Sequence, residues 1–215
     1  MLEKLPDALG HALRGQRAGL DKIAFQAVDL RAGMASITVA SLAFVDHAPI
    51  PALYTADGSG ASPPLQWFGA PGNAGSLALI VEDADAPTPH PLVHAIVVDL
   101  PVGDGSGALA EGALSSESGA GAELHLGRNS YLQTGWLPPD PPPGHGVHRY
   151  AFQLFALAAG ATFDGTPGRD ALLEAIREHG LASGCLIGTY ERPDTSIKTP
   201  VDADAAPIAI SPLAT

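Results

Sequence analysis

The feature that most constrains the fold is a series of apolar runs that end in Gly- or Pro-rich loops, with only one clear helical pattern among them. Runs typical of β-strands cover residues 35–44, 76–87, 90–101, 148–157 and 185–192. Because helices do not alternate with these runs, a parallel doubly wound sheet is disfavoured. The 25 Gly and 20 Pro residues indicate many turns, and the 46% of hydrophobic residues can form a sizeable core. The sequence therefore predicts a mainly β fold.

The sequence pattern divides the chain into an extension, a main domain and a tail. Residues 1–33 are predicted to form an N-terminal helical extension, in which leucines such as Leu9 and Leu13 recur near helical spacing. Such an apolar stripe must be buried. It packs either on its own domain or on a second copy of the chain, so a homodimer through residues 1–33 is one prediction. Residues 34–193 form the main domain, and residues 194–215 are expected to lie on the surface or to be partly disordered.

The one clear helical pattern lies within residues 165–184. We expect Thr166 or Asp170 to cap its start and Gly180 to end it. Residues 102–136, by contrast, are rich in Gly, Ser and Ala, and we interpret them as a long loop. Loops of that length are usually functional or mobile.

Composition excludes several classes of function. The formal net charge is −12 and no basic stripe is present, so we expect no nucleic-acid partner and no binding to anionic membranes through bulk charge. The single cysteine, Cys185, rules out an intramolecular disulfide and a cysteine-based zinc site. We interpret it as an unreactive thiol. No run reaches transmembrane length and the N-terminus lacks a secretory apolar segment, so we expect a cytoplasmic protein without integral membrane association.

Polar side chains stand at the ends of the apolar runs. They are Asp83 and Asp85 at the end of one run, His94 near the start of the next, and His148, Arg149 and Tyr150 at the start of another. Burial of such groups without partners costs on the order of several kcal/mol, so we expect them to converge. We predict that Asp83 accepts a hydrogen bond from His94 and that Asp85 pairs with Arg149. A mostly apolar pocket with a few convergent polar groups is typical of a ligand site.

The same residues allow other chemistry. His145 and His148 have the spacing of a metal-binding pair, but spacing defines no third ligand, so we predict no metal. Asp83, His94 and His148 can serve as the acid–base groups of a hydrolase. No Ser or Cys has a defined place beside them as nucleophile, so we predict a protein that is not an enzyme. Nothing in the sequence indicates a cofactor, and a protein-interaction or inhibitor module that presents residues 102–136 is a further alternative.

Several motifs resemble the phosphatidylethanolamine-binding protein family, in particular its bacterial Raf-kinase-inhibitor-like branch. The motifs are SPPLQW, DADAP, HAIVVDLP, PPPGHGVHRYAFQLFAL and HGLASGCLIGTYER, and the resemblance covers about residues 36–193. It implies an antiparallel, sandwich-like β fold with a large central sheet, a smaller sheet and peripheral helices. It also implies a pocket for a small anionic ligand or the phosphoryl headgroup of a phospholipid, without catalysis.

The resemblance assigns roles to individual residues. The ligand-binding residues that it implies are Asp83, Pro87, His94, Pro141, Pro142, His148 and Tyr150. Asp85 and Arg149 match the structural polar pair beside the site, and the Ala86–Pro87 peptide bond is expected to be cis. The chain departs from the family pattern at Asp140, where Gly usually precedes the two prolines, and Trp136 is expected to give the pocket aromatic cover.

Asp83 raises a question of charge, because a carboxylate in a small pocket repels an anion. Asp83 can be paired with a protonated His94, be protonated itself, or meet a cation of the ligand such as an ethanolamine ammonium. We favour the first, since contact between an imidazole and a carboxylate favours the charged imidazole. Anion affinity should then fall as pH rises through the range in which histidine loses its proton.

Overall fold

The computed structural model describes residues 6–28, 35–115 and 124–192. The large sheet consists of β1 (Ala35–Ser36), β4 (Ala74–Asp83), β5 (Leu92–Leu100), β7 (His125–Leu126), β8 (His148–Ala158) and β9 (Gly180–Tyr190). The small sheet consists of β2 (Thr38–Ala40), β3 (Leu65–Phe68) and β6 (Gly107–Leu109). The strand orders are β1-β9-β8-β4-β5-β7 and β2-β3-β6. Apart from the parallel pair β1 and β9, neighbouring strands are antiparallel, which confirms the predicted antiparallel β architecture.

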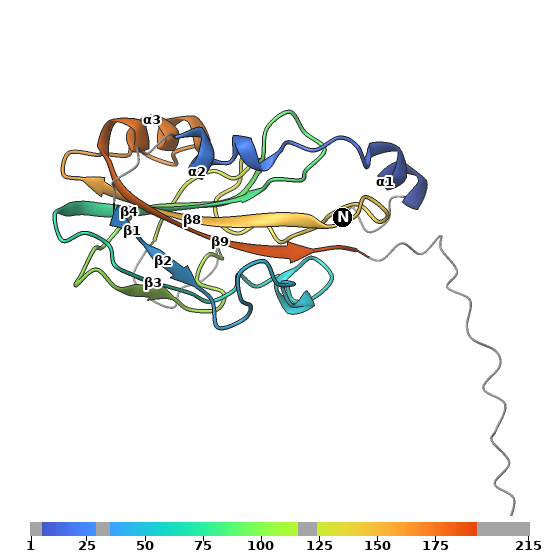
Figure 1. Cartoon of the computed structure of the whole chain (residues 1–215), viewed down its shortest axis with the longest axis horizontal. Coiled ribbons are helices and arrows are strands. Elements are labelled where there is room, and N and C mark those ends of the chain that lie inside the picture. Colours follow the sequence, from blue (N-terminus) through green and yellow to red (C-terminus); the bar gives the residue numbers. More distant parts are fainter. Residues whose placement is uncertain (1–5, 29–34, 116–123, 193–215) are drawn as a thin grey trace, which may run out of the picture.

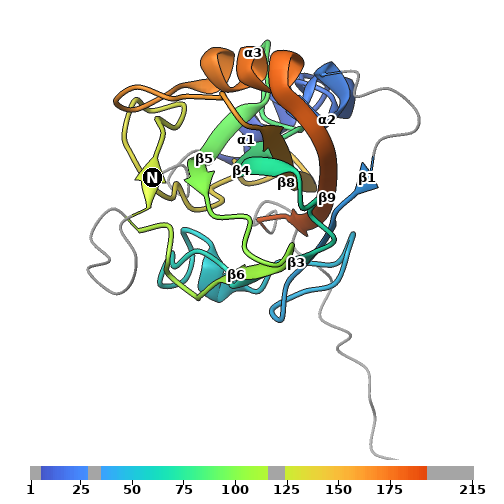
Figure 2. The ribbon, with the colours of Figure 1, turned by 90° about the vertical axis from the view of Figure 1, so that its left-hand side faces the viewer.

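The two faces of the large sheet bury separate apolar clusters. Along β4, Leu77, Leu79 and Val81 pack toward the small sheet, whereas Ala78 and Ile80 belong to the cluster on the opposite face. This division follows from strand geometry, because successive side chains point to opposite faces. Figure 2 shows the resulting layers, with the small sheet below the large sheet and the helices above it.

The helices are α1 (Asp7–Leu13), α2 (Ala24–Ala27) and α3 (Arg169–His179), with short 3-10 turns η2 (Leu20–Lys22) and η3 (Ala52–Tyr54). No helix of the described residues is long and apolar enough to cross a membrane. The residue before α3 is Gly168, and no side chain caps the helix. The predicted caps are therefore wrong: Thr166 lies outside the helix, and Asp170 is already its second residue. Gly180 follows the helix as predicted and begins β9 at once.

The part of the N-terminal extension within residues 6–28 packs on its own domain. The N–H of Ala24 at the start of α2 donates to Glu82 Oε2 at 2.6 Å. Glu82 is fully buried and also accepts hydrogen bonds from Gln153 and Arg169. A helix start leaves backbone N–H groups without partners, and this carboxylate satisfies one of them. A homodimer through residues 1–33 stays a prediction.

Two further predicted segments have mixed outcomes. Residues 102–136 are not simply a loop, because they contain β6 and β7. Residues 116–123 of that segment and the tail 194–215 lie outside the described residues.

Candidate functional site

Antiparallel pairing brings the predicted polar residues to one end of the large sheet. Asp83, the last residue of β4, pairs with Leu92 of β5 on one side and with Tyr150 of β8 on the other. The end of β4 and the starts of β5 and β8 therefore coincide. Figure 1 shows α1 at the same end of the sheet, near the end of β9.

A small cavity of about 60 Å³ lies at this end of the sheet. Its lining residues are Asp83, Ala86, Pro87, Leu92, His94, Tyr131, Leu137, Pro138, Asp140, Pro141, Pro142 and His148. Six of the seven residues predicted to bind a ligand are among them, and Tyr150 contacts the ring of His94 from β8. The cavity is thus a proline-rimmed hollow with carboxylates and imidazoles in its wall.

Asp83 pairs with His148, not with His94 as predicted. His148 Nδ1 lies 2.7 Å from Asp83 Oδ2, and both side chains are almost completely buried. The second ring nitrogen of His148, Nε2, lies 2.7 Å from Nδ1 of His145. Asp83 and His148 face each other because their strands are neighbours in the sheet, whereas the hydrogen bond of His94 goes elsewhere.

A β-bulge explains the position of His94. Val81 pairs with Ala95 and Glu82 with Val93, so His94 is an extra residue in β5. Simple alternation puts His94 on the face of Ile96 and Val98, but the bulge turns its side chain to the other face. There its ring packs edge-on against Tyr150. Alternation alone therefore assigns His94 to the wrong face of β5.

His94 is a neutral imidazole with one unused nitrogen. Its Nδ1 donates to the backbone carbonyl of Leu137 at 2.6 Å. Burial lowers the pKa of His94 below its ordinary value, although the negative charge of Asp83 acts in the opposite direction. The expectation of a protonated His94 is therefore wrong. With the proton on Nδ1, Nε2 carries a lone pair, and this buried atom has no hydrogen-bond partner among the described residues.

The hydroxyl of Tyr150 is likewise buried without a partner among the described residues. Burial raises the pKa of Tyr150 well above its ordinary value, so the hydroxyl keeps its proton and can donate. The Trp136 ring lies 6.0 Å from that of His94, but Trp136 is not among the residues that line the cavity, so it does not give the cavity the predicted aromatic cover. Trp136 Nε1 and Trp67 Nε1 are also buried without a partner among the described residues. Buried polar atoms without partners are uncommon and costly.

Asp85 and Arg149 form the predicted pair beside the cavity. Arg149 Nε and Nη2 donate to the two carboxylate oxygens at 2.6 and 2.7 Å, and Arg17 Nη1 lies 2.9 Å from Oδ1. Burial alone would raise the pKa of Asp85, but the hydrogen bonds and charges of the two arginines outweigh it and lower this pKa. The pair fixes the loop after β4 to the start of β8, where Asp83 and His148 lie.

The rim on the other side contains a second charged cluster. Arg192 Nη2 lies 2.8 Å from Asp140 Oδ1, and Nη1 of the same side chain donates to the carbonyl of Pro141 at 2.8 Å. Arg192 also binds both oxygens of Asp57. Asp140 is therefore paired with an arginine, and Arg192 shares its single positive charge between Asp140 and Asp57.

The predicted cis bond before Pro87 is wrong. No peptide bond of the described residues is cis. The carbonyl of Ala86 accepts hydrogen bonds from the N–H of Thr88 at 2.8 Å and from the N–H of Ala18 at 3.0 Å. The first of these closes a tight turn centred on Pro87, whose fixed φ suits such a turn with a trans bond.

Sequence reasoning missed several residues that complete the site. His145 was considered only as a metal ligand, but it is fully buried and hydrogen-bonded to His148. Arg17 and Arg192 were not singled out, and Tyr131 was not expected in the cavity wall. Their partners are distant in sequence, so no local pattern announces them.

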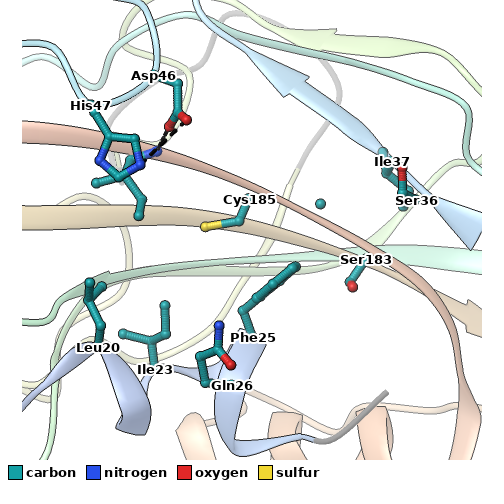
Figure 3. Close-up of a pocket in the computed structure, with 12 residues that line it drawn as sticks. Leu20, Ile23, Phe25, Gln26, Ser36, Ile37, Asp46, His47, Ser183 and Cys185 are labelled. Atoms are coloured by element: carbon teal, nitrogen blue, oxygen red, sulfur yellow. Dashed lines mark hydrogen bonds and ion pairs between the residues drawn. The ribbon is translucent and has the colours of Figure 1, made fainter. Parts of the chain in front are cut away.

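A second, larger hollow of about 410 Å³ lies between the N-terminal segment and strand β9. Figure 3 shows Leu20, Ile23 and Phe25 on one side and Cys185 on the other. Burial raises the pKa of Cys185 to about 12, so its thiol is not a nucleophile at neutral pH. None of the residues around this hollow has a buried polar atom without a partner. We therefore regard the smaller cavity as the candidate site.

The polar side chains in the wall of the smaller cavity are those of Asp, His and Tyr, and the wall contains no Ser, Thr, Cys or Lys side chain. No group of three or more His, Cys, Asp or Glu side chains in residues 6–28, 35–115 and 124–192 is placed to hold a metal ion. His145 and His148 bond to each other instead of opening toward a shared metal.

Comparisons with known proteins agree with the fold. A UPF0098 protein of Methanothermobacter thermautotrophicus is 36% identical over 159 residues, which cover 70% of this chain and 95% of that protein. The crystal structure of the phosphatidylethanolamine-binding protein homologue CT736 from Chlamydia trachomatis is 35% identical, covers 73% of this chain and 98% of that chain, and has a TM-score of 0.64.

A further similar structure is that of Escherichia coli YbcL, described as a new member of the mammalian PEBP family, with a TM-score of 0.66 and 24% identity. The match covers 74% of this chain and 99% of that chain, and at this identity it supports the fold alone. The sequence model of the phosphatidylethanolamine-binding protein family matches residues 40–191. This match spans the cavity residues and the strands of both sheets other than β1 and most of β2. The chain therefore belongs to the phosphatidylethanolamine-binding protein family.

Proposed function

We propose that this protein binds a small anion that carries a proton donor, and that it catalyses no reaction on this anion. A phosphate monoester, either free or as the headgroup of a lipid, is such an anion. The observation that carries the proposal is the pair of buried atoms, His94 Nε2 and Tyr150 Oη, that have no partner among the described residues. Neutral His94 offers a lone pair and Tyr150 offers a proton. A singly protonated phosphoryl group supplies the matching donor and acceptor.

Cavity size supports a headgroup rather than a whole lipid. A volume of about 60 Å³ is well below the roughly 300–1,000 Å³ of pockets that enclose a drug-sized ligand. A phosphate or carboxylate group fits this space, and the rest of a larger ligand must lie outside it. Tyr131 is on the rim with 55% of its surface exposed, and it can contact such a remainder.

The charge balance of the wall also supports an anion. Asp83 is paired with His148, and Asp140 with Arg192. Neither carboxylate therefore acts on a ligand as an isolated negative charge. We expect the affinity for the anion to fall as pH rises. The hydrogen bond at His94 Nε2 requires a proton, which either His94 or the phosphoryl group must keep.

The proposal is tested by calorimetric titration with inorganic phosphate and with phosphoethanolamine at pH 6 and pH 8. We expect saturable binding that is weaker at pH 8 and is lost in His94→Phe. His125→Phe is the matched control, because His125 bonds to Asp99 away from the cavity. Binding that is independent of pH, or unchanged in His94→Phe, would contradict the proposal, as would release of phosphate from a chromogenic phosphate ester.

A second arm separates a free anion from a lipid headgroup. Vesicles of phosphatidylcholine with and without phosphatidic acid, a lipid whose phosphate is a monoester, are sedimented with the protein. Retention only on vesicles with phosphatidic acid, abolished by excess phosphoethanolamine, would identify the lipid headgroup as the source. No retention together with phosphate binding would identify a free anion. No binding in either arm would overturn the proposed function.

A further inference from the structure

The N-terminal segment is hydrogen-bonded to the loop after β4, although it lies outside the family match of residues 40–191. The N–H of Ala18 donates to the carbonyl of Ala86 at 3.0 Å, and the N–H of Gly19 donates to that of Ala84 at 2.7 Å. These contacts join the segment to the loop that ends with Pro87 at the cavity.

The same segment also holds the loop before β8. Arg14 Nε donates to the carbonyl of Gly144 at 3.2 Å. Arg17 donates from Nη1 to the carbonyl of Val147 at 2.7 Å and from Nη2 to that of His145 at 3.1 Å. One stretch of chain thus joins both loops of the cavity and surrounds His145.

The directions of the hydrogen bonds at His145 follow from its partners. The carbonyl of Leu13 can only accept, so His145 Nε2, 2.9 Å away, must donate to it. In a neutral His145 the other nitrogen, Nδ1, is then an acceptor. Burial lowers the pKa of His145 and the charge of His148 lowers it further, which agrees with the neutral form.

The same reasoning fixes the protons of His148. Because His145 Nδ1 accepts, His148 Nε2 must donate to it across 2.7 Å. Asp83 Oδ1 accepts the N–H of Asp85 at 2.8 Å, and such a hydrogen bond favours the ionised carboxylate. With Asp83 ionised, its Oδ2 accepts a proton from His148 Nδ1, 2.7 Å away. Both ring nitrogens of His148 then carry protons.

We propose that the Leu13 carbonyl of the N-terminal segment, acting through His145, holds His148 doubly protonated and so keeps the His148–Asp83 pair electrically neutral beside the cavity. His145 is a positioning residue in this scheme, because it acts through His148. The effect on ligand affinity rests on the proposed function, whereas the protonation of His148 does not. An anion then meets no net charge from this pair.

The other charged or titratable groups around His148 come from several elements. They are His94 on β5, Tyr150 on β8, Asp140 with Arg192 on the rim, and Arg17 on the N-terminal segment. Arg17 lies near Asp85 as well, and Asp85 is shared with Arg149. None of these groups substitutes for His145 as the acceptor of the Nε2 proton.

Nitrogen NMR of histidine-labelled full-length protein, without ligand at pH 7.5, tests the proposal. Ring-nitrogen shifts and couplings show which nitrogens of His148 carry protons. We expect both to be protonated in the wild-type chain. In His145→Leu the ratio of doubly to singly protonated His148 should fall at least about tenfold, as expected for loss of a hydrogen bond to a charged donor. His145→Asn keeps an acceptor oxygen and should restore most of the wild-type signal.

A matched pair of glycine variants tests the role of the N-terminal segment without changing a polar side chain. A Cβ added at Gly10 in α1 would overlap the carbonyl of Pro143, so Gly10→Ala must displace the helix from this loop. Gly15→Ala meets open space. We expect the loss of His148 protonation in Gly10→Ala and the wild-type signal in Gly15→Ala.

The outcomes separate this inference from the proposed function. A singly protonated His148 in the wild-type chain, or one that stays doubly protonated in both His145→Leu and Gly10→Ala, would overturn the inference even if phosphate binds. A doubly protonated His148 that responds as expected, in a protein that binds no phosphate, would support the inference and refute the proposed function.

Discussion

Removing the unpartnered hydroxyl of Tyr150 should stabilise the protein, whereas removing a hydrogen-bonded hydroxyl from a structural residue should destabilise it. A buried hydroxyl without a hydrogen bond costs about 1–3 kcal/mol. Tyr150→Phe removes that group and leaves the ring contacts with His94 and His148 in place. We expect the free energy of unfolding of the ligand-free protein to rise by about 1 kcal/mol, at the low end because solvent can enter a small cavity.

Tyr54→Phe is the matched control. The Tyr54 hydroxyl donates to Glu111 Oε2 at 2.8 Å, and the side chain is buried. Its removal loses a hydrogen bond and should lower the free energy of unfolding by about 1 kcal/mol. The two Tyr→Phe variants should therefore differ by about 2 kcal/mol, or about 4–8 °C in Tm for a chain of this size.

Urea denaturation in a buffer free of phosphate and carboxylates measures both changes, with equal m-values as the check that the denatured states are alike. Phosphate titration of Tyr150→Phe should show an affinity about tenfold below wild type, because one hydrogen bond to a charged ligand is lost. If Tyr150→Phe is destabilised as much as Tyr54→Phe, the hydroxyl has a partner within the protein, and the reasoning from unpartnered atoms fails.

Other predictions concern the frame around the site. Arg149→Met should lower the free energy of unfolding by about 2–3 kcal/mol. This is less than the loss of one partner from a fully buried ion pair, because Arg17 also lies near Asp85. The folded-state pKa of Asp85 is lowered by the two arginines. The stabilisation is therefore complete above about pH 4 and is lost as pH falls through the folded value; a urea series from pH 7 to about pH 2 in which the difference between wild type and variant stays constant would refute this. Gly184→Ala should destabilise by about 2–4 kcal/mol, because its Cβ would overlap the carbonyl of Ile37; a Tm within about 1 °C of wild type would contradict this packing. The thiol of Cys185, with a pKa of about 12, should react with iodoacetamide at pH 8 more than about a hundredfold slower than in urea; equal rates would show that it is an ordinary exposed thiol.

The main strand segments and the position of the site were predictable from sequence because both depend on local pattern. The apolar runs define β4, β5 and β8, and the polar residues at their ends indicate where the strands meet. Asp85 and Arg149 were paired correctly, since each stands at a strand end beside the other.

The errors arise where tertiary geometry overrides the pattern. A single bulge moves His94 to the other face of β5, and no alternation rule reveals an extra residue. His145 acquires its role from the carbonyl of Leu13, 132 positions away. Arg17 lies 130 positions from Val147, and Arg192 lies 51 positions from Pro141. Such contacts require the folded chain.

The central claim is tested most directly by a crystal soaked with phosphate at pH 6 and compared with an unsoaked crystal. The account predicts a tetrahedral anion in the cavity, within hydrogen-bond distance of His94 Nε2 and the Tyr150 hydroxyl. It also predicts that the Asp83–His148 contact of 2.7 Å is unchanged. A cavity without the anion at a phosphate concentration that saturates binding in solution, or an anion bound only elsewhere, would contradict the account.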